Sequence, residues 1–569
     1  MARELAPAFP QRLARRRLDA ERLAQQACVT VFAVFLWLFV LYPMLQVLWR
    51  SLHDNDGRLV GVANYVRYVR TPAIAASITN SLVVSATAMV ITVVLAFVYA
   101  YALTRVRLPG RAVFRVAAML PLFAPSLVHG FALVYLFGNN GLLTRHTGIN
   151  VGIYGIKGIV LAEVLYCFPH AVLILAAALS AADARLYDAA AALGARRLRT
   201  FLTVTLPGVK YGVMSACFVV FTTVITDFGA PKVLGGKTSV MATEIYNQVI
   251  GQQNFTMGAT VSVVLLIPAM LAVIIDRIVQ RRQYALISSS ARPLAPGGGP
   301  LTRWSVFVYC ALAAAAIASV YVVVLATSLV ARWPYDLTLT LKHYRFDTAG
   351  GYTALVNSLE TAALTALIGT AMAFVGAYLV EKSRTPAAGV LYMVSLLPVS
   401  IPGMVLGLAY IFVFNAPGTA LNRLYGTLAI LVISNLVHYF TVPFLTATTT
   451  LKQMDAEFEH VGASMGVPFY LTFWRVTVPI ALPAIVGISM YFFLNAMVTL
   501  SAAVFLVAPG TELAAVAVLL MDDAGDTAQA AAMSVLIVAV GLTVRLVYWR
   551  VLRGVDRRTQ AWRGAGERR

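Results

Sequence analysis

Twelve long apolar runs constrain this chain more than any other feature of its sequence. A helix needs about 20 consecutive apolar residues to cross the hydrocarbon core of a bilayer, and each run is close to that length or longer. The chain is 60% hydrophobic and only 12% charged over 569 residues, which excludes an ordinary soluble protein of this size. The sequence therefore predicts an all-α membrane protein with about twelve transmembrane helices.

The runs fall into two sets of six, and the second set repeats the first. Asn-Ser-Leu at 80–82 recurs at 357–359, and Leu-Pro at 120–121 recurs at 397–398, both 277 residues further on. Because six is an even number, the two halves share one orientation, and a substrate path is expected between them. The predicted spans are residues 28–49, 80–104, 113–137, 156–180, 211–232, 257–275, 304–330, 353–380, 387–414, 425–446, 480–507 and 528–549.

The net charge of +20 comes from short clusters of Lys and Arg at the ends of apolar runs. That placement is a topology signal rather than a nucleic-acid surface, and it predicts that both termini are cytoplasmic. The predicted organisation is a cytoplasmic basic N-terminus (1–27), a first transmembrane domain (28–279), a cytoplasmic linker (280–303), a second transmembrane domain (304–549) and a cytoplasmic basic tail (550–569).

A polar loop follows the fourth run of each half, at 183–207 and at 455–479. Each copy contains a Gly and, further on, a Val-Thr-x-Pro, and these positions recur 272 residues apart. In the first copy an Ala-rich run with an acid at its start predicts a short helix that ends in a turn at Gly194. A second amphipathic segment ends where Pro207 opens the next apolar run. An ordinary amphipathic loop is the alternative, but it does not explain why the spacing occurs twice.

These loops resemble the EAA loop of the membrane subunits of type I ATP-binding-cassette (ABC) importers, in which Glu-Ala-Ala is followed by Gly and then by Ile-x-Leu-Pro. The second copy departs from this pattern, because its Glu459 lies one place early and no Ala-Ala follows. The resemblance implies two tandem six-helix type I ABC importer domains, whose loops dock in the ATPase subunits and transmit their motion. The coupling residues that it implies are Asp188, Ala189, Ala190, Gly194, Pro207, Glu459, Gly462, Gly466 and Pro479.

The resemblance also implies partners and a location. The family implies a multi-pass protein of the bacterial inner membrane, two ABC ATPase subunits on the cytoplasmic side and a periplasmic substrate-binding protein. Gly235–Thr238 is similar to the end of a phosphate-binding loop, but Pro231 stands where that motif needs a Gly. The chain is therefore expected to be no enzyme and to have no catalytic residue, while ATP and Mg are used by the partner ATPase. No bound cofactor, metal site or nucleic-acid partner is expected.

The resemblance extends to the substrate. Within this family, the chain is similar to the fused double permeases that transport ferric iron, thiamine and 2-aminoethylphosphonate. Residues 226–233 and 244–255 look most like the 2-aminoethylphosphonate members, so this zwitterion is the predicted substrate. Ferric iron is the alternative, followed by thiamine or a polyamine. An ion-coupled secondary transporter would also have two parallel halves but no use for paired docking loops, and a membrane-embedded enzyme would need more converging polar residues.

Five polar residues are candidates for the substrate path. Asp227, near the outer end of the fifth span, could attract a cationic group, or it is an interfacial acid in contact with water. Glu163 and His170 are seven residues apart and share one helical face, where they line a polar path or bond within the bundle. Tyr246 and Gln248 belong to an amide-rich outer loop, which suits a periplasmic partner or substrate, or is simply solvated.

Overall fold

The long helices confirm the predicted fold class. The computed structural model describes residues 9–284, 294–297, 299–382, 387–455 and 457–559. Within these residues nine helices are long and apolar enough to cross a membrane, and three bent helix pairs bring the number to twelve if each pair is one span. The sheet structure of the described residues is one antiparallel hairpin, β1 (Val330–Arg332) with β2 (Asp336–Leu339).

The first half contains the helices up to residue 284, and short π or 3-10 turns (η) interrupt them. Its elements are α1 (Phe9–Leu36), η1 (Trp37–Leu41), α2 (Tyr42–Ser51), α3 (Ala63–Arg70), α4 (Pro72–Arg105), α5 (Arg111–Met119), η2 (Leu120–Phe123), α6 (Ser126–Phe137), α7 (Leu142–Thr147), α8 (Ile156–Ser180), α9 (Ala184–Ala192), α10 (Arg197–Thr200), η3 (Phe201–Thr205), α11 (Leu206–Thr226), α12 (Gly229–Leu234), α13 (Met241–Tyr246), η4 (Asn247–Gly251) and α14 (Phe255–Tyr284).

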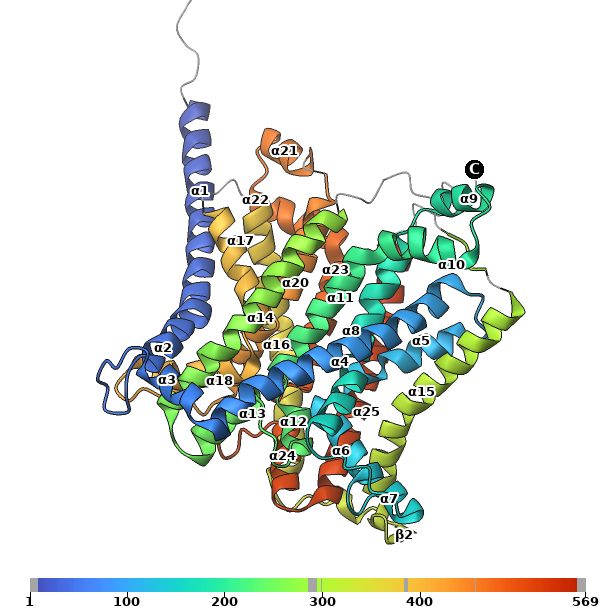
Figure 1. Cartoon of the computed structure of the whole chain (residues 1–569). Coiled ribbons are helices and arrows are strands. Elements are labelled where there is room, and N and C mark those ends of the chain that lie inside the picture. The colour runs from blue at the N-terminus through green and yellow to red at the C-terminus, as the bar shows by residue number, and fades with distance from the viewer. Residues whose placement is uncertain (1–8, 285–293, 298, 383–386, 456, 560–569) are drawn as a thin grey trace, which may run out of the picture.

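The second half repeats this arrangement. Its elements are α15 (Pro300–Leu329), the hairpin β1–β2, η5 (Lys342–Tyr344), α16 (Gly351–Glu381), α17 (Ala388–Leu396), η6 (Leu397–Ser400), α18 (Gly403–Phe414), η7 (Ala420–Leu424), α19 (Leu428–His438), α20 (Thr441–Lys452), α21 (Glu457–Ser464), α22 (Phe469–Thr472), η8 (Phe473–Thr477), α23 (Val478–Met497), α24 (Ala514–Asp523) and α25 (Thr527–Thr559). We call the end of the molecule that bears α9 and α21 the docking end, and the end that bears α7, α24 and the hairpin the far end (Figure 1).

Helix α1 begins at the docking end (Figure 1). The predicted linker, residues 280–303, includes the end of α14, which continues to Tyr284, and the start of α15, which begins at Pro300. Residues 285–293 and 298 of this linker lie outside the described residues, as do residues 1–8 and 560–569. In the described part of the linker, the backbone of Gly297 bonds to that of Arg105 and Arg107.

The third span of each half is not the continuous helix that the sequence predicted. The two helices of the pair bend by 103° after Phe123 in the first half and by 111° after Ser400 in the second. Pro125 and Pro402 stand directly before the second helix of each pair. Proline has no N–H for the helical hydrogen bond and drives the preceding residue out of the α conformation, so each span breaks at the same place.

The prolines that close the two docking loops act differently from the prediction. Pro207 and Pro479 were expected to separate an amphipathic segment from the next span, but Arg197–Thr226 and Phe469–Met497 are each continuous helices. A π turn, η3 or η8, stands directly before each proline-containing turn. A π turn relieves the clash that a proline ring makes with the preceding helical turn, so the loop is joined rigidly to the span.

The first helix of each half packs against the other half. The Phe39 ring stacks on Phe414 at 5.8 Å between ring centroids, and its carbonyl accepts a hydrogen bond of 2.9 Å from Tyr410 Oη. In the reverse direction, Tyr309 Oη of α15 donates to the carbonyl of Leu95 in α4, at 2.6 Å. This exchange interlocks the halves, so α1 stands beside second-half helices in Figure 1.

Candidate translocation path and docking loops

A cavity of about 360 Å³ lies between the two halves. Its walls come from α8, α11 and α14 of the first half and from η6, α19 and α23 of the second. Among the predicted path residues, Asp227 and His170 line it. Its other polar side chains include Tyr166, Thr222, Thr223, Thr226, Asp276, Arg277, His438, Tyr439, Tyr491 and Asn495.

Asp227 is held rigidly at the wall of this cavity. It directly follows α11 as the C-cap residue, where the backbone turns from helical to extended. Its Oδ1 accepts a hydrogen bond of 2.7 Å from Ser126 Oγ, and its Oδ2 accepts one of 3.0 Å from the backbone N–H of Ala230. The carboxylate therefore joins α11, α6 and α12, and its position is fixed before any solute arrives.

Glu163 lies behind Asp227 rather than in the cavity wall. Its side chain is completely buried, and its carboxyl group interacts with that of Asp227. The positions 272 residues further on are Asn435 and Thr499, which carry no charge. The two carboxyl groups therefore give the first-half side of the cavity an acidic character that the matching place in the second half lacks.

Two histidines, one from each half, line the cavity. His170 comes from α8 and His438 from the end of α19. In the described part of the chain, the Nδ1 atom of each is buried without a hydrogen-bond partner. A neutral imidazole can use such a nitrogen to bind a metal ion or a polar solute. Within the described residues, however, no three His, Cys, Asp or Glu side chains gather as a metal-binding group.

Gln248 is buried and Tyr246 is partly buried, so this segment is not the simply solvated loop that was one of its two predicted alternatives. Gln248 is only 3% exposed, and its Nε2 donates to Glu244 Oε1 at 2.8 Å. Tyr246 ends α13, and its ring stacks on Phe505 of the second half at 6.2 Å between centroids. The segment can be buried because its polar side chains form hydrogen bonds with one another. A polar sequence alone does not show which side chains pair in this way.

A contact between the halves lies beside this stack. Lys232 Nζ lies 3.3 Å from Asp523 Oδ1 and 5.1 Å from the ring centroid of Tyr246. Asp522 lies next to this ion pair in α24, outside the candidate spans. Burial, and secondly the Asp523 carboxylate, raise the pKa of Asp522 to about 6, so this second acid is ionised at neutral pH and loses its charge below about pH 6. We call Lys232, Tyr246, Phe505 and Asp523 the far-end gate.

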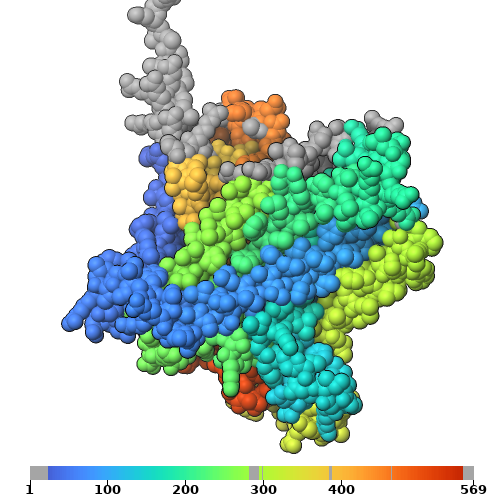
Figure 2. Space-filling view, viewed as in Figure 1, coloured from blue at the N-terminus to red at the C-terminus, as the bar shows by residue number. Residues whose placement is uncertain are grey.

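The docking loops have the helix–turn–helix form predicted for them. Asp183 Oδ1 accepts from the backbone N–H of Arg185 and caps α9, so the helix begins earlier than the Asp188 proposed at its start. Gly194 and Gly466 follow the helices with φ of +70° and +68°, the left-handed conformation that glycine adopts most easily. Figure 2 shows the two loops as separate projections at the docking end.

Matched positions on the two docking helices expose apolar side chains. Leu186 and Leu193 of the first loop are 57% and 87% exposed, and the residues 272 further on, Phe458 and Met465, are 45% and 74% exposed. Asp188 is exposed on α9 as well. Glu459 instead pairs with Lys382 of the same chain, so its carboxylate is directed inward.

Two parallel halves around a shared polar cavity, each with a projecting helical loop at one end, define the membrane-spanning permease of a solute transporter. The chain belongs to the family described as binding-protein-dependent transport system inner membrane components, whose model matches residues 88–284. It is a type I ABC importer permease with both transmembrane domains in one chain, a multi-pass inner membrane protein and a transporter subunit rather than an enzyme.

The chain is similar to several transport permeases. The chain is 26% identical to the ferric transport system permease protein FbpB of Actinobacillus pleuropneumoniae, over 90% of this chain and 76% of that protein. It is also 26% identical to the putative ferric transport system permease protein FbpB 1 of Haemophilus influenzae, over 86% and 78%. The molybdenum transport system permease protein ModB of Mycobacterium tuberculosis is 33% identical over 32% of this chain and 70% of that protein.

Proposed function

We propose that this permease imports ferric iron rather than 2-aminoethylphosphonate. Two ferric transport permeases match it over 90% and 86% of its length, whereas the resemblance to the 2-aminoethylphosphonate members is confined to two short segments. The observation that supports iron best is Asp227, an acid fixed in the cavity wall with Glu163 behind it. A ferric ion gains Coulomb energy beside these carboxyl groups, whereas the zwitterion would gain through its ammonium group and lose through its phosphonate group. Imidazole nitrogens such as those of His170 also suit iron.

The proposed cycle assigns a side of the membrane to each end. The docking end faces the cytoplasm, where two ATPase subunits bind the apolar faces of α9 and α21, and a periplasmic binding protein delivers iron to the far end. When ATP closes the ATPase pair, the two loops approach each other and the far-end gate opens. Hydrolysis restores the closed gate, and iron leaves the cavity toward Asp276 and Arg277 near the cytoplasmic end of α14.

One experiment tests both the class and the substrate. The chain is purified with the ATPase encoded beside it, reconstituted in proteoliposomes, and ATP hydrolysis is measured with the neighbouring binding protein loaded with Fe(III) or with 2-aminoethylphosphonate. Stimulation by the Fe(III)-loaded protein alone is the expected result. Stimulation by the phosphonate alone would restore the earlier prediction. Uptake that follows the proton gradient without any ATPase would instead indicate a secondary transporter.

Loosening the far-end gate is expected to release ATP hydrolysis from its dependence on the binding protein. Lys232→Met removes the ion pair with Asp523. The side chains of Lys232 and Asp523 are 25% and 43% exposed, so the ion pair stabilises the contact by about 1 kcal/mol or less. We expect unstimulated hydrolysis to rise by up to about fivefold, as Asp523→Asn should also show. Lys237→Met, in the following loop, is the control that leaves the rate unchanged. An unaltered rate in both gate variants would contradict the proposed gate.

The two left-handed turns are expected to matter for coupling rather than for insertion. A Cβ at Gly194 or Gly466 meets nothing within 4 Å, so Gly194→Val and Gly466→Val cost only backbone strain of about 1–2 kcal/mol each. We expect iron uptake per ATP hydrolysed to fall in both variants while the protein still inserts. Gly208→Val and Gly487→Val are matched controls, because these glycines also face open space but have ordinary helical backbones. Unchanged coupling in both turn variants would show that the turns are dispensable.

A further inference from the structure

A basic residue at the end of the second span reaches the docking helix in each half. Arg105 is the last residue of α4, and Lys382 directly follows α16. The two residues are 277 apart, the same offset as the matched second spans. Both side chains are largely buried although both carry a charge: Arg105 is 8% exposed, and the Lys382 side chain is 10% exposed. Charged side chains are rarely buried to this degree unless they are paired.

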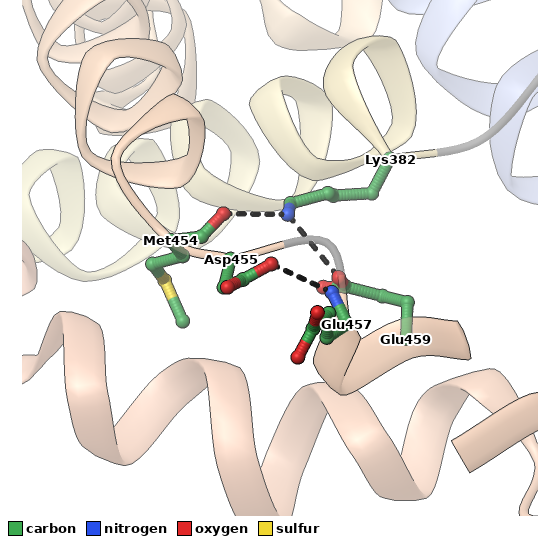
Figure 3. Close-up of polar contacts among 5 residues, drawn as sticks. All are labelled: Lys382, Met454, Asp455, Glu457 and Glu459. Atoms are coloured by element: carbon green, nitrogen blue, oxygen red, sulfur yellow. Dashed lines mark hydrogen bonds and ion pairs between the residues drawn. The ribbon is translucent and has the colours of Figure 1, made fainter. Parts of the chain in front are cut away.

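In the second half, Lys382 bridges three helices (Figure 3). Its Nζ donates to the carbonyl of Met454 at 3.3 Å and lies 3.2 Å from Glu459 Oε2. Met454 follows the end of α20, where carbonyl groups lack helical partners and attract cations. Glu459 belongs to α21, and Asp455 Oδ1 caps the start of that helix through the N–H of Glu457 at 3.0 Å. The lysine thus joins the second span, the fourth span and the docking helix.

In the first half, Arg105 makes the same connections with different chemistry. Its Nη2 donates to the carbonyl of Leu179 at the end of α8, at 2.6 Å. Its guanidinium carbon lies 5.1 Å from the ring centroid of Tyr187 in α9, a cation–π contact. Tyr187 Oη in turn donates to Thr205 Oγ1 at 3.1 Å, at the π turn before the fifth span.

The two contacts are equivalent by position and not by residue type. Tyr187 and Glu459 lie 272 residues apart, the offset of the repeated loops. An arginine on an aromatic ring in one half therefore replaces a lysine on a carboxylate in the other, and the connection between the same three elements is retained. The same elements are in contact in both halves although both residue types differ. This indicates that the contact between the second span, the fourth span and the docking helix is itself required.

We propose that Arg105 and Lys382 are positioning residues that fasten the docking helices to the second and fourth spans. The inference rests on the proposed docking of ATPase subunits at α9 and α21. A docking helix that moves with its ATPase then carries along α4 and α8, or α16 and α20. Those spans pack against α11 and α23, which line the cavity. Glu459, one of the coupling residues that the resemblance implies, serves this internal contact.

The attachment is tested first on the purified permease alone, by hydrogen exchange of the amides of residues 457–464. Lys382→Met is expected to speed their exchange about fivefold, the effect of losing a partly buried ion pair, and Lys382→Arg is expected to restore protection. Lys452→Met is the matched control, because it breaks an ion pair of 3.7 Å with Glu381 that does not involve α21. Equal exchange in Lys382→Met and wild type would overturn the proposal.

The second measurement is the amount of iron taken up per ATP hydrolysed, in proteoliposomes with the ATPase and loaded binding protein. Lys382→Met and Glu459→Gln are expected to lower this ratio, and the double variant to lower it no further, because both remove one interaction. An unchanged ratio together with faster exchange would show that the attachment is only structural and would overturn the coupling role. Failure of the wild-type chain to bind any ATPase would remove the proposed function, whereas the exchange difference would still report the attachment.

Discussion

Replacing Asp227 by Asn is expected to lower iron uptake by the reconstituted importer by about tenfold or more. The amide has nearly the shape of the carboxylate and its oxygen still accepts the hydrogen bond from Ser126, but its nitrogen cannot accept from the Ala230 N–H, and the change removes a negative charge from the cavity wall. Two unit charges 4 Å apart interact by about 4 kcal/mol at the effective dielectric of a partly hydrated site, and about 1.4 kcal/mol is already a factor of ten. Initial uptake of radioactive iron per permease measures the effect.

Two variants separate charge from geometry at this site. Ser126→Ala removes the hydrogen bond to Asp227 but leaves its charge, so uptake should fall much less than in Asp227→Asn. Thr499→Asp adds an acid at the position that matches Asp227 in the second half, and in the Asp227→Asn background it should recover part of the uptake. Normal iron uptake in Asp227→Asn would show that the charge of this residue has no role in the iron path.

The large features of the fold were predictable because each depends on a local rule. The length of an apolar run sets the number of spans, and a Gly between two short amphipathic segments sets the docking turn at Gly194. The breaks at Pro125 and Pro402 follow equally local rules, yet they were missed because an apolar run hides whether its helix is straight. In the same way, the π turns before Pro207 and Pro479 show that a proline can be absorbed without ending a helix.

The contacts that connect the halves and the loops could not be predicted, because each joins residues far apart in the chain. Nothing in the sequence pairs Lys232 with Asp523, which are neighbours only after α12 and α24 pack at the far end. Arg105 and Lys382 did leave a signal, since they are basic residues at the same offset as the repeated spans. Their partners, however, can be identified only from the fold, in which α9 and α21 lie close to the ends of the fourth spans.

The largest effect on assembly is expected from Leu186→Asp combined with Phe458→Asp. These exposed apolar side chains occupy matched positions on α9 and α21, and burying one large apolar side chain in a partner stabilises a complex by about 1.5–3 kcal/mol. An aspartate there loses this energy and adds the cost of a buried unpaired charge. We therefore expect ATPase binding to weaken by about 100-fold or more in the double variant, measured by co-purification and by titration of the ATPase.

Leu301→Asp distinguishes docking from a general loss of apolar surface. Leu301 lies in the first turn of α15, is 83% exposed and lies outside both repeated loops, so its replacement should leave ATPase binding unchanged. The single variants Leu186→Asp and Phe458→Asp should each retain one ATPase subunit if the two loops bind independently, and neither if the subunits associate only as a pair. Full ATPase binding by the double variant would show that these helices are not the docking surface, and the coupling assigned to Gly194 and Gly466 would then need another route.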